Sequence, residues 1–149
     1  MKRLLLLFLA SPVAAWAAFV PPFTIIQDTR DIELAANAGV TKTDEKMVRI
    51  DTPQGIEQSG QVKLYFNGKR ATQKIVEAYT LKPNGDKVLV SEDRIKVRNV
   101  EADDLAPYFS DQMMTVIIFP QVEIGSKVYY KAITEQKEPI LKGHFSTKI

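Results

Sequence analysis

Apolar residues recur at every second position through most of this chain, in short runs that are separated by turn-forming residues. One run covers residues 62–66 and stops at Asn67-Gly68, and another covers residues 127–134. Successive side chains of a β-strand point to opposite faces, so this period is typical of half-buried strands. No segment of the sequence has the spacing of an amphipathic helix. Many short strands with turns between them predict an all-β chain that folds as an antiparallel β-sandwich.

The strongest turn signal is Pro83-Asn84-Gly85-Asp86. Proline presets φ, and Asn-Gly tolerates the positive φ of a tight hairpin. We therefore expect this turn to join a strand at residues 72–81 to its return at residues 88–90. Strict alternation along the first of these strands places Val76, Ala78 and Thr80 on one face.

Three other segments have distinct patterns. Residues 113–119 are apolar at nearly every position, which predicts a central strand covered on both faces. Residues 40–50 are mostly polar, with Val48 and Ile50 as the strong inward candidates, so we expect a strand with one solvated face or a place at a sheet edge. Residues 51–60 contain a proline and two glycines and predict a loop with at most one helical turn.

Residues 1–17 have the composition of a secretory signal peptide. Lys2 and Arg3 precede an apolar stretch, and small residues follow at Ala15 and Ala17, so we expect cleavage after Ala17. The alternative is an uncleaved membrane anchor, but the apolar run is shorter than the ~20 residues that a membrane-spanning helix needs. The sequence therefore predicts a periplasmic or secreted protein that meets a membrane only through its signal peptide, during export. It predicts little or no helix outside this peptide.

The remainder divides into residues 18–30, a linker or first strand, and residues 31–149, one β-sandwich domain. Alternation continues from His144 to Ile149 without a closing turn or a polar tail. A strand cut in mid-pattern would leave an unprotected edge. We expect a domain that is incomplete at its C-terminus and a natural protein that continues past Ile149. The alternative is a final edge strand that frays at its tip.

Charge and cysteine content exclude several classes of protein. The chain has 20 lysines and arginines against 18 acidic residues, and removal of Lys2 and Arg3 with the signal peptide would balance them. A balanced surface argues against nucleic acid and against a basic segment lying on a membrane. The absence of cysteine excludes disulfides, thiolate metal sites and a cysteine nucleophile. We expect no cofactor and no metal.

Candidate catalytic and metal-binding groups are few. His144 is the single histidine and shares a strand face with Ser146, but a triad also needs an orienting carboxylate and oxyanion donors, so a structural role is favoured. Asp103-Asp104 offers carboxylates to calcium, which prefers six or more oxygens from a sharply turned loop. Residues 101–111 have no glycine for such a turn, so a solvated loop face is favoured there. The sequence predicts no catalytic residue and no metal ligand.

Candidate binding residues are basic. Arg94, Lys96 and Arg98 alternate along one predicted strand and form a stripe that Lys87 and Lys131 could extend. This stripe could bind an anionic partner such as a polysaccharide or an acidic peptide. The alternative, which is favoured, is a solvated sheet edge that charge keeps soluble.

Four tyrosines could form a stacking platform for sugar rings: Tyr65, Tyr79, Tyr129 and Tyr130. Tyrosines on strand faces more often pack in the core or against cross-strand neighbours. Packing is therefore the favoured interpretation.

Several stretches of this sequence resemble one bacterial family. They are Glu77-Ala78-Tyr79-Thr80-Leu81-Lys82-Pro83-Asn84-Gly85, Phe109-Ser110-Asp111-Gln112 with Val116-Ile117-Ile118-Phe119-Pro120, Val122-Glu123-Ile124-Gly125-Ser126, and Lys137-Glu138-Pro139 with Gly143-His144-Phe145. The family is a domain of unknown function (number 3857) at the N-terminus of secreted bacterial transglutaminase-like proteins. The resemblance covers residues 51–149 well and residues 25–50 more loosely.

This resemblance implies a β-sandwich that is followed by a transglutaminase-like core with a Cys-His-Asp constellation, none of which carries over to this chain. We therefore expect a non-catalytic accessory domain that positions substrate or the catalytic core, with a C-terminal transglutaminase-like domain of the same natural protein as its partner. The alternative is a stand-alone periplasmic binding module for a protein or an envelope polymer. By itself the chain is not expected to be an enzyme.

Overall fold

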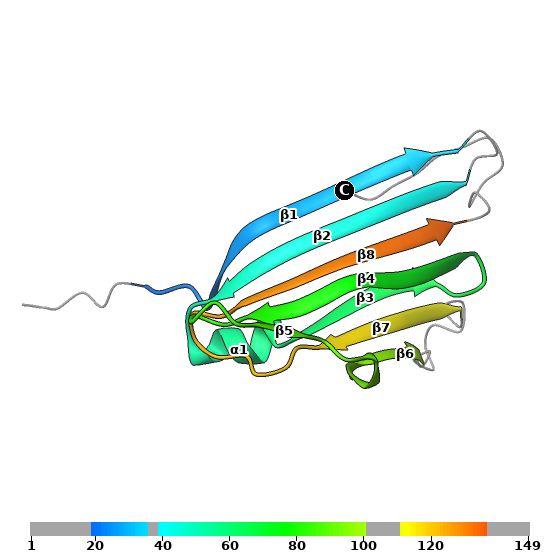
Figure 1. Ribbon diagram of the computed structural model, residues 1–149. Coiled ribbons are helices and arrows are strands. Elements are labelled where there is room, and N and C mark those ends of the chain that lie inside the picture. Colours follow the sequence, from blue (N-terminus) through cyan, green and yellow to red (C-terminus); the bar gives the residue numbers. More distant parts are fainter. Residues whose placement is uncertain (1–18, 36–38, 101–110, 137–149) are drawn as a thin grey trace, which may run out of the picture.

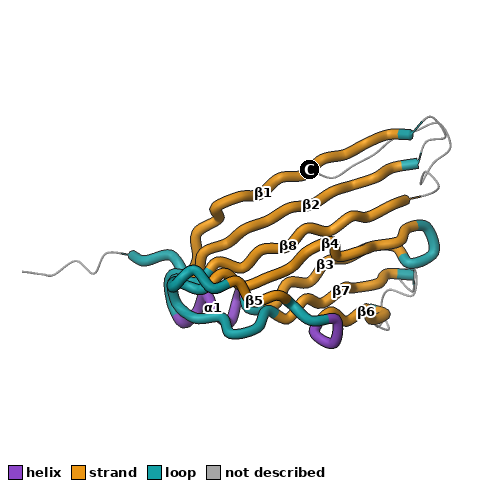
Figure 2. The backbone as a smooth tube through the Cα atoms, viewed as in Figure 1, coloured by secondary structure: helices purple, strands orange, loops and turns teal. Residues whose placement is uncertain are grey.

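A computed structural model describes residues 19–35, 39–100 and 111–136 of the chain. Strands account for most of the described residues, as Figure 2 shows. In chain order the elements in Figure 1 are β1 (Phe23–Leu34), β2 (Val40–Ile50), α1 (Pro53–Ser59), β3 (Gln61–Asn67), β4 (Ala71–Leu81), β5 (Lys87–Leu89), the 3-10 helix η1 (Glu92–Arg94), β6 (Ile95–Asn99), β7 (Gln112–Ile118) and β8 (Lys127–Gln136). The expected all-β fold is confirmed.

The strands form two sheets, and every pairing in them is antiparallel. Sheet A has five strands in the order β1-β2-β8-β4-β5, and sheet B has three in the order β3-β7-β6. β8 and β7 are therefore the central strands of their sheets, as Figure 1 allows the reader to follow. The sequence pattern of residues 113–119 predicts this central place for β7.

The core lies between the two sheets, toward the end of the sandwich that carries α1. Alternation along β8, which the sequence predicts over residues 127–134, directs Val128, Tyr130 and Ala132 inward. They pack in one cluster with Ile50 of β2 and Ile117 of β7, both of which are 0% exposed. Burial of these aliphatic side chains provides most of the free energy that holds the sheets together.

The helix α1 is longer than the single turn expected for residues 51–60. Thr52 takes the extended N-cap conformation, and its side chain accepts a hydrogen bond from the backbone N–H of Gly55 at 3.3 Å. Pro53 occupies the first turn, where its missing N–H is not needed. The Thr-Pro pair is a start signal that outweighs the glycines that follow it. A Cβ at Gly55 would lie 2.0 Å from the carbonyl oxygen of Pro22, so this close approach requires glycine.

The β4–β5 hairpin forms at the predicted turn. Gly85 has φ of +93°, and the backbone N–H of Lys82 donates to the carbonyl of Asp86 at 2.8 Å. The prediction that Val76 shares a face with Ala78 and Thr80 is wrong. The register of β4 on β8 shifts between Ile75 and Glu77, so Val76 occupies a β-bulge and is 48% exposed. A bulge inserts one residue and reverses the alternation beyond it, which places Ile75 against the core instead.

The polar strand β2 does not lie at an edge, because it pairs with β1 on one side and β8 on the other. Val48 and Ile50 are buried as predicted. Lys42, Asp44 and Lys46 on this face are charged, and three-stranded sheet B is too narrow to cover all five strands of sheet A. Each charge has a partner: Lys46 with Asp28 at 2.8 Å, Arg30 with Asp44 at 2.7 Å, and Lys42 with Asp44 at 2.8 Å.

Within residues 19–35, 39–100 and 111–136 no helix has the length and apolar character needed to cross a membrane. The signal peptide expected at residues 1–17 lies outside these ranges. So do Asp103-Asp104, the pair formed by His144 and Ser146, and the strand expected up to Ile149.

The buried strand β7 yields a paired stability prediction. Ile117→Ala should lower the free energy of unfolding by about 3 kcal/mol, because it leaves a cavity between the sheets. Thr115 is also buried, yet its hydroxyl has no hydrogen-bond partner among the described residues. Thr115→Val should therefore leave the stability unchanged or raise it by about 1 kcal/mol. Urea unfolding of the two variants checks this, and a loss in Thr115→Val as large as that in Ile117→Ala would contradict it.

Tyr130 makes stability depend on alkaline pH. Burial, with the carboxylates of Asp44 and Asp28 nearby, raises the pKa of Tyr130 from 10 to about 12. The protonated phenol is favoured in the folded state, so its contribution is fully present below the unfolded pKa and is lost as pH rises from 10 to about 12. Across that window the protein should lose roughly 2 kcal/mol more stability than Tyr130→Phe does. Urea unfolding at several pH values tests this, with Tyr65→Phe as the control for loss of an exposed phenol. Parallel curves for the protein and Tyr130→Phe would contradict it.

Candidate functional site

The predicted basic stripe is only partly formed. Lys96 and Arg98 lie on β6 and pair with Val116 and Met114 of β7, so they share one face of sheet B. Arg94 does not belong to this strand, because it ends the 3-10 helix η1. The predicted alternation begins one residue too early: backbone hydrogen bonding of the turn, from the Arg94 N–H to the carbonyl of Ser91, takes Arg94 out of the extended conformation.

Lys87 and Lys131 do not extend the stripe. Both lie on sheet A, on β5 and β8, and each is bound to a carboxylate there. Lys87 contacts Glu77 at 2.6 Å, and this hydrogen bond raises the pKa of Lys87. Lys131 contacts Glu45 at 2.5 Å, which likewise raises the pKa of Lys131. These two lysines are therefore neutralised within their own sheet.

The outer face of sheet B gathers residues that the sequence does not group. The register pairs Lys63 of β3 with Val116, and Val116 with Lys96, in one row across the three strands. Tyr65, Met114 and Arg98 form the neighbouring row. Val62 and Ile117 pack in the core, so alternation directs both rows to the opposite face. We call the surface formed by Lys63, Tyr65, Lys96 and Arg98 the basic face.

The cations of the basic face form no ion pair in the described part of the chain, although Lys96 helps lower the pKa of Asp93 after the larger effect of the Ser91 hydrogen bond. Lys63, Lys96 and Arg98 are exposed, and none has a carboxylate within ion-pair distance in the described part of the chain. By contrast, the lysines and arginines of β1, β2, β5 and β8 that are named above are all paired. Exposed cations beside the half-exposed ring of Tyr65 can bind an anion and an apolar group together. The basic face is the candidate functional site.

The four tyrosines do not form one platform. Tyr79 and Tyr129 stack on sheet A with ring centroids 4.8 Å apart, and the Nζ of Lys87 lies 3.9 Å from the centre of the Tyr79 ring. Tyr130 points into the core, and Tyr65 lies on the basic face. Packing is therefore the role of Tyr79, Tyr129 and Tyr130, and Tyr65 is the one of the four that stands beside free cations among the described residues.

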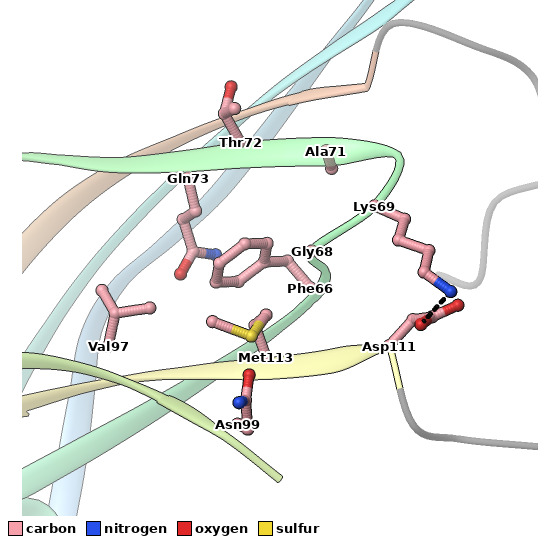
Figure 3. Close-up of a pocket in the computed structure, with 10 residues that line it drawn as sticks. All are labelled: Phe66, Gly68, Lys69, Ala71, Thr72, Gln73, Val97, Asn99, Asp111 and Met113. Carbon is pink, nitrogen blue, oxygen red and sulfur yellow. Dashed lines mark ion pairs between the residues drawn. The ribbon is translucent and has the colours of Figure 1, made fainter.

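A cavity of about 400 Å³ opens between the sheets near the β3–β4 turn (Figure 3). Phe66, Val97 and Met113 supply apolar walls, and Lys69 pairs with Asp111 at the rim at 2.7 Å. Gln73 also lines this cavity. Its Nε2 donates to Thr134 Oγ1 at 3.1 Å, whereas its Oε1 has no partner among the described residues. The cavity offers apolar walls and the unpartnered Oε1 of Gln73 beside the polar side chains of Thr72 and Asn99, but its lining places no nucleophile next to a base.

Comparisons with known proteins bear on the fold. The family model of DUF3857, a domain of unknown function with solved structure, matches residues 36–149. No curated protein matches the chain. A crystal structure of a putative protease from Parabacteroides distasonis is similar over 78% of this chain and 23% of that chain, with a TM-score of 0.71 and 16% identity. A CBM3a-L domain with flanking linkers, from scaffoldin cipA of the Clostridium thermocellum cellulosome, is similar over 77% of this chain and 68% of that chain, with a TM-score of 0.43 and 11% identity.

The first of these structures shares the fold of the described sandwich. This chain spans about a quarter of the length of that protein, so the fold forms one part of a larger molecule there. The family model covers most of the present chain, including β2 through β8. The chain therefore belongs to the DUF3857 family of domains of unknown function.

Proposed function

We propose that this chain is a non-catalytic accessory domain of a periplasmic or secreted transglutaminase-like protein, in which it positions substrate or the catalytic part. The observation that carries the proposal is the size relation with the Parabacteroides distasonis protein, which is named a putative protease and of which the shared fold makes up 23%. Proteases and transglutaminases both act at amide bonds. The same β-sandwich beside either kind of catalytic part is consistent with a role in holding a polypeptide.

The composition of the chain supports a role without catalysis, in which a separate part of the protein carries out the reaction. A transglutaminase-like core uses a cysteine nucleophile, and this chain has none. In this proposal the nucleophile comes from another part of the natural protein, and the sandwich lies beside that part and positions it or its substrate. Export fits the same proposal: residues 1–17 have the form of a signal peptide, and the fold needs no disulfide because its core and ion pairs hold it together.

An immunoblot of fractionated source cells tests this proposal. An antibody raised against residues 51–136 should detect a periplasmic or secreted protein several times larger than the 16.8 kDa of this chain. The catalytic part adds the extra mass, and export places the band outside the cytoplasm. A band that stays in the cytoplasm would contradict the location, and a band near the mass of this chain would contradict the larger protein.

A second candidate function is a stand-alone binding module for a protein or an envelope polymer. The observation that favours it is the basic face, whose three cations lack carboxylate partners in the described part of the chain. Unpaired charges on one face attract an anionic ligand, and such attraction weakens as salt screens it.

Charge reversal on β6 tests the binding module. The purified protein should be retained on immobilised polyglutamate at low salt, and Lys96→Glu with Arg98→Glu should weaken that retention at least about tenfold, because two attractive charges become repulsive. Arg70→Glu with Lys74→Glu is the matched control, since Arg70 directly precedes β4, Lys74 lies on β4, and both are exposed cations away from the basic face. Equal losses in the two double variants would mean that net charge, and not the basic face, governs retention.

A further inference from the structure

The strand β3 ends sheet B and has no partner on its outer side among the described residues. Its seven residues pair with β7 in one continuous register without a shift. It contains no proline, and Lys63 is its one charged residue. An edge of this kind is a template for another extended chain, which natural proteins usually block with charge, proline or a bulge.

The hydrogen-bonding pattern identifies the backbone groups that face outward. The N–H of Phe119 donates to the carbonyl of Gly60 at 3.0 Å, and the N–H of Gly68 donates to the carbonyl of Asp111 at 2.8 Å. Hydrogen-bonded and non-hydrogen-bonded pairs alternate in an antiparallel ladder, so the even-numbered residues of β3 bond to β7. The N–H and C=O groups of Gln61, Lys63 and Tyr65 therefore point away from β7, toward the free edge.

The other described edges are better protected. β5 has three residues and β6 has five, which limits the number of hydrogen bonds that either can offer. β1 is longer, but its register shifts between Ile25 and Gln27. Beyond that bulge β1 carries charged residues: Asp28, Arg30, Asp31 and Glu33. β3 combines length, regular register and few charges, so it is the least protected edge in the described part of the chain.

A largely apolar cavity of about 290 Å³ lies beside this edge. Val62 and Leu64 of β3 form its apolar walls together with Phe23, Val48 and Val128 of sheet A, and the polar residues Lys46, Gln58, Ser59 and Lys63 also line it. A strand added to β3 would direct every second side chain to the same side as Val62 and Leu64. Apolar side chains of the added strand would therefore enter the cavity.

The opposite side of the added strand would face the basic face instead of the cavity. Its remaining side chains would lie next to Lys63 and Tyr65 on the basic face. Lys63 has no carboxylate within ion-pair distance among the described residues, and Lys96 lies two strands further in the same row, beyond Val116 of β7. Acidic side chains at these positions would complement the charge.

We propose that the free edge of β3 binds an extended peptide in which apolar and acidic residues alternate, by adding it as a fourth strand of sheet B. Backbone groups of Gln61, Lys63 and Tyr65 supply the hydrogen bonds, the cavity receives the apolar side chains, and Lys63 pairs with an acidic one. This site does not depend on a catalytic part in the natural protein, so it can fail or hold independently of the function proposed above.

Fluorescence anisotropy with synthetic peptides tests the site. The probe is a labelled octapeptide of alternating valine and glutamate, titrated with the purified protein. It should bind saturably, and a peptide with lysine in place of glutamate should bind at least about tenfold more weakly because it repels Lys63. The valine–glutamate octapeptide with its fourth residue replaced by proline should also bind more weakly, because proline cannot donate to the ladder.

Two proline variants separate the β3 edge from the rest of sheet B. Tyr65→Pro removes an outward N–H and should weaken binding of the valine–glutamate peptide about tenfold. Val97→Pro is the matched control, because Val97 lies on the opposite edge strand, is 54% exposed like Tyr65, and by the same alternation also directs its N–H outward. It should leave binding unchanged.

Lys63→Glu keeps the backbone of β3 and tests the charge without the risk of unfolding. It should weaken binding of the glutamate peptide about tenfold and strengthen binding of the lysine peptide. Lys74→Glu, an exposed lysine of β4, should change neither.

Three results would overturn the proposal. The first is no saturable binding of the valine–glutamate peptide up to about 1 mM. The second is equal weakening by Tyr65→Pro and Val97→Pro together with no effect of Lys63→Glu. The third is concentration-dependent dimerisation that Tyr65→Pro abolishes, in the absence of peptide binding, since this would assign the edge to a second copy of the chain.

Discussion

The apolar contact between β8 and β2 of one sheet and β7 of the other is the constraint on which the rest of the fold depends. Ile50 and Ile117 are fully buried there, and Val128 and Ala132 pack against the same cluster. A sheet of three strands cannot cover a sheet of five, so this contact is confined to part of sheet A. The part of β2 that extends beyond the core is polar because of that mismatch. Ion pairs with β1 neutralise its charged side chains there.

The same mismatch separates two surfaces that differ in charge pairing. Lys46, Lys87 and Lys131 of sheet A are paired with carboxylates on neighbouring strands, whereas Lys63, Lys96 and Arg98 of the basic face have no ion pair among the described residues. Sheet B also has a long and regular free edge at β3, next to a cavity that its narrow width leaves open. The peptide site proposed on β3 rests on these features of the narrow sheet.

Local patterns predicted the elements better than the connections between them. Alternation located β3 and β8 and their inward residues, and the Pro83–Asp86 turn located the hairpin, because these signals act within a few residues. The errors arose where a single cap, bulge or turn overrides the alternation or composition of the surrounding residues. The N-cap Thr52, whose side chain accepts a hydrogen bond from the Gly55 N–H, lengthens α1, the bulge at Val76 reverses the faces of β4, and the 3-10 turn removes Arg94 from its strand. The cap could have been read from the Thr-Pro pair, but the bulge is defined only against its partner strand.

The sequence by itself determined that the described chain is all-β, which side chains of β3 and β8 face the core, and that no cysteine chemistry is available. These properties follow from residue type and from a period of two along single strands. The tertiary structure alone decided that Lys63 and Tyr65 join Lys96 and Arg98 on one face, and that β3 rather than β2 ends a sheet. Strand order is set by packing between residues that are distant in the chain, and a period within one strand carries no information about its neighbour.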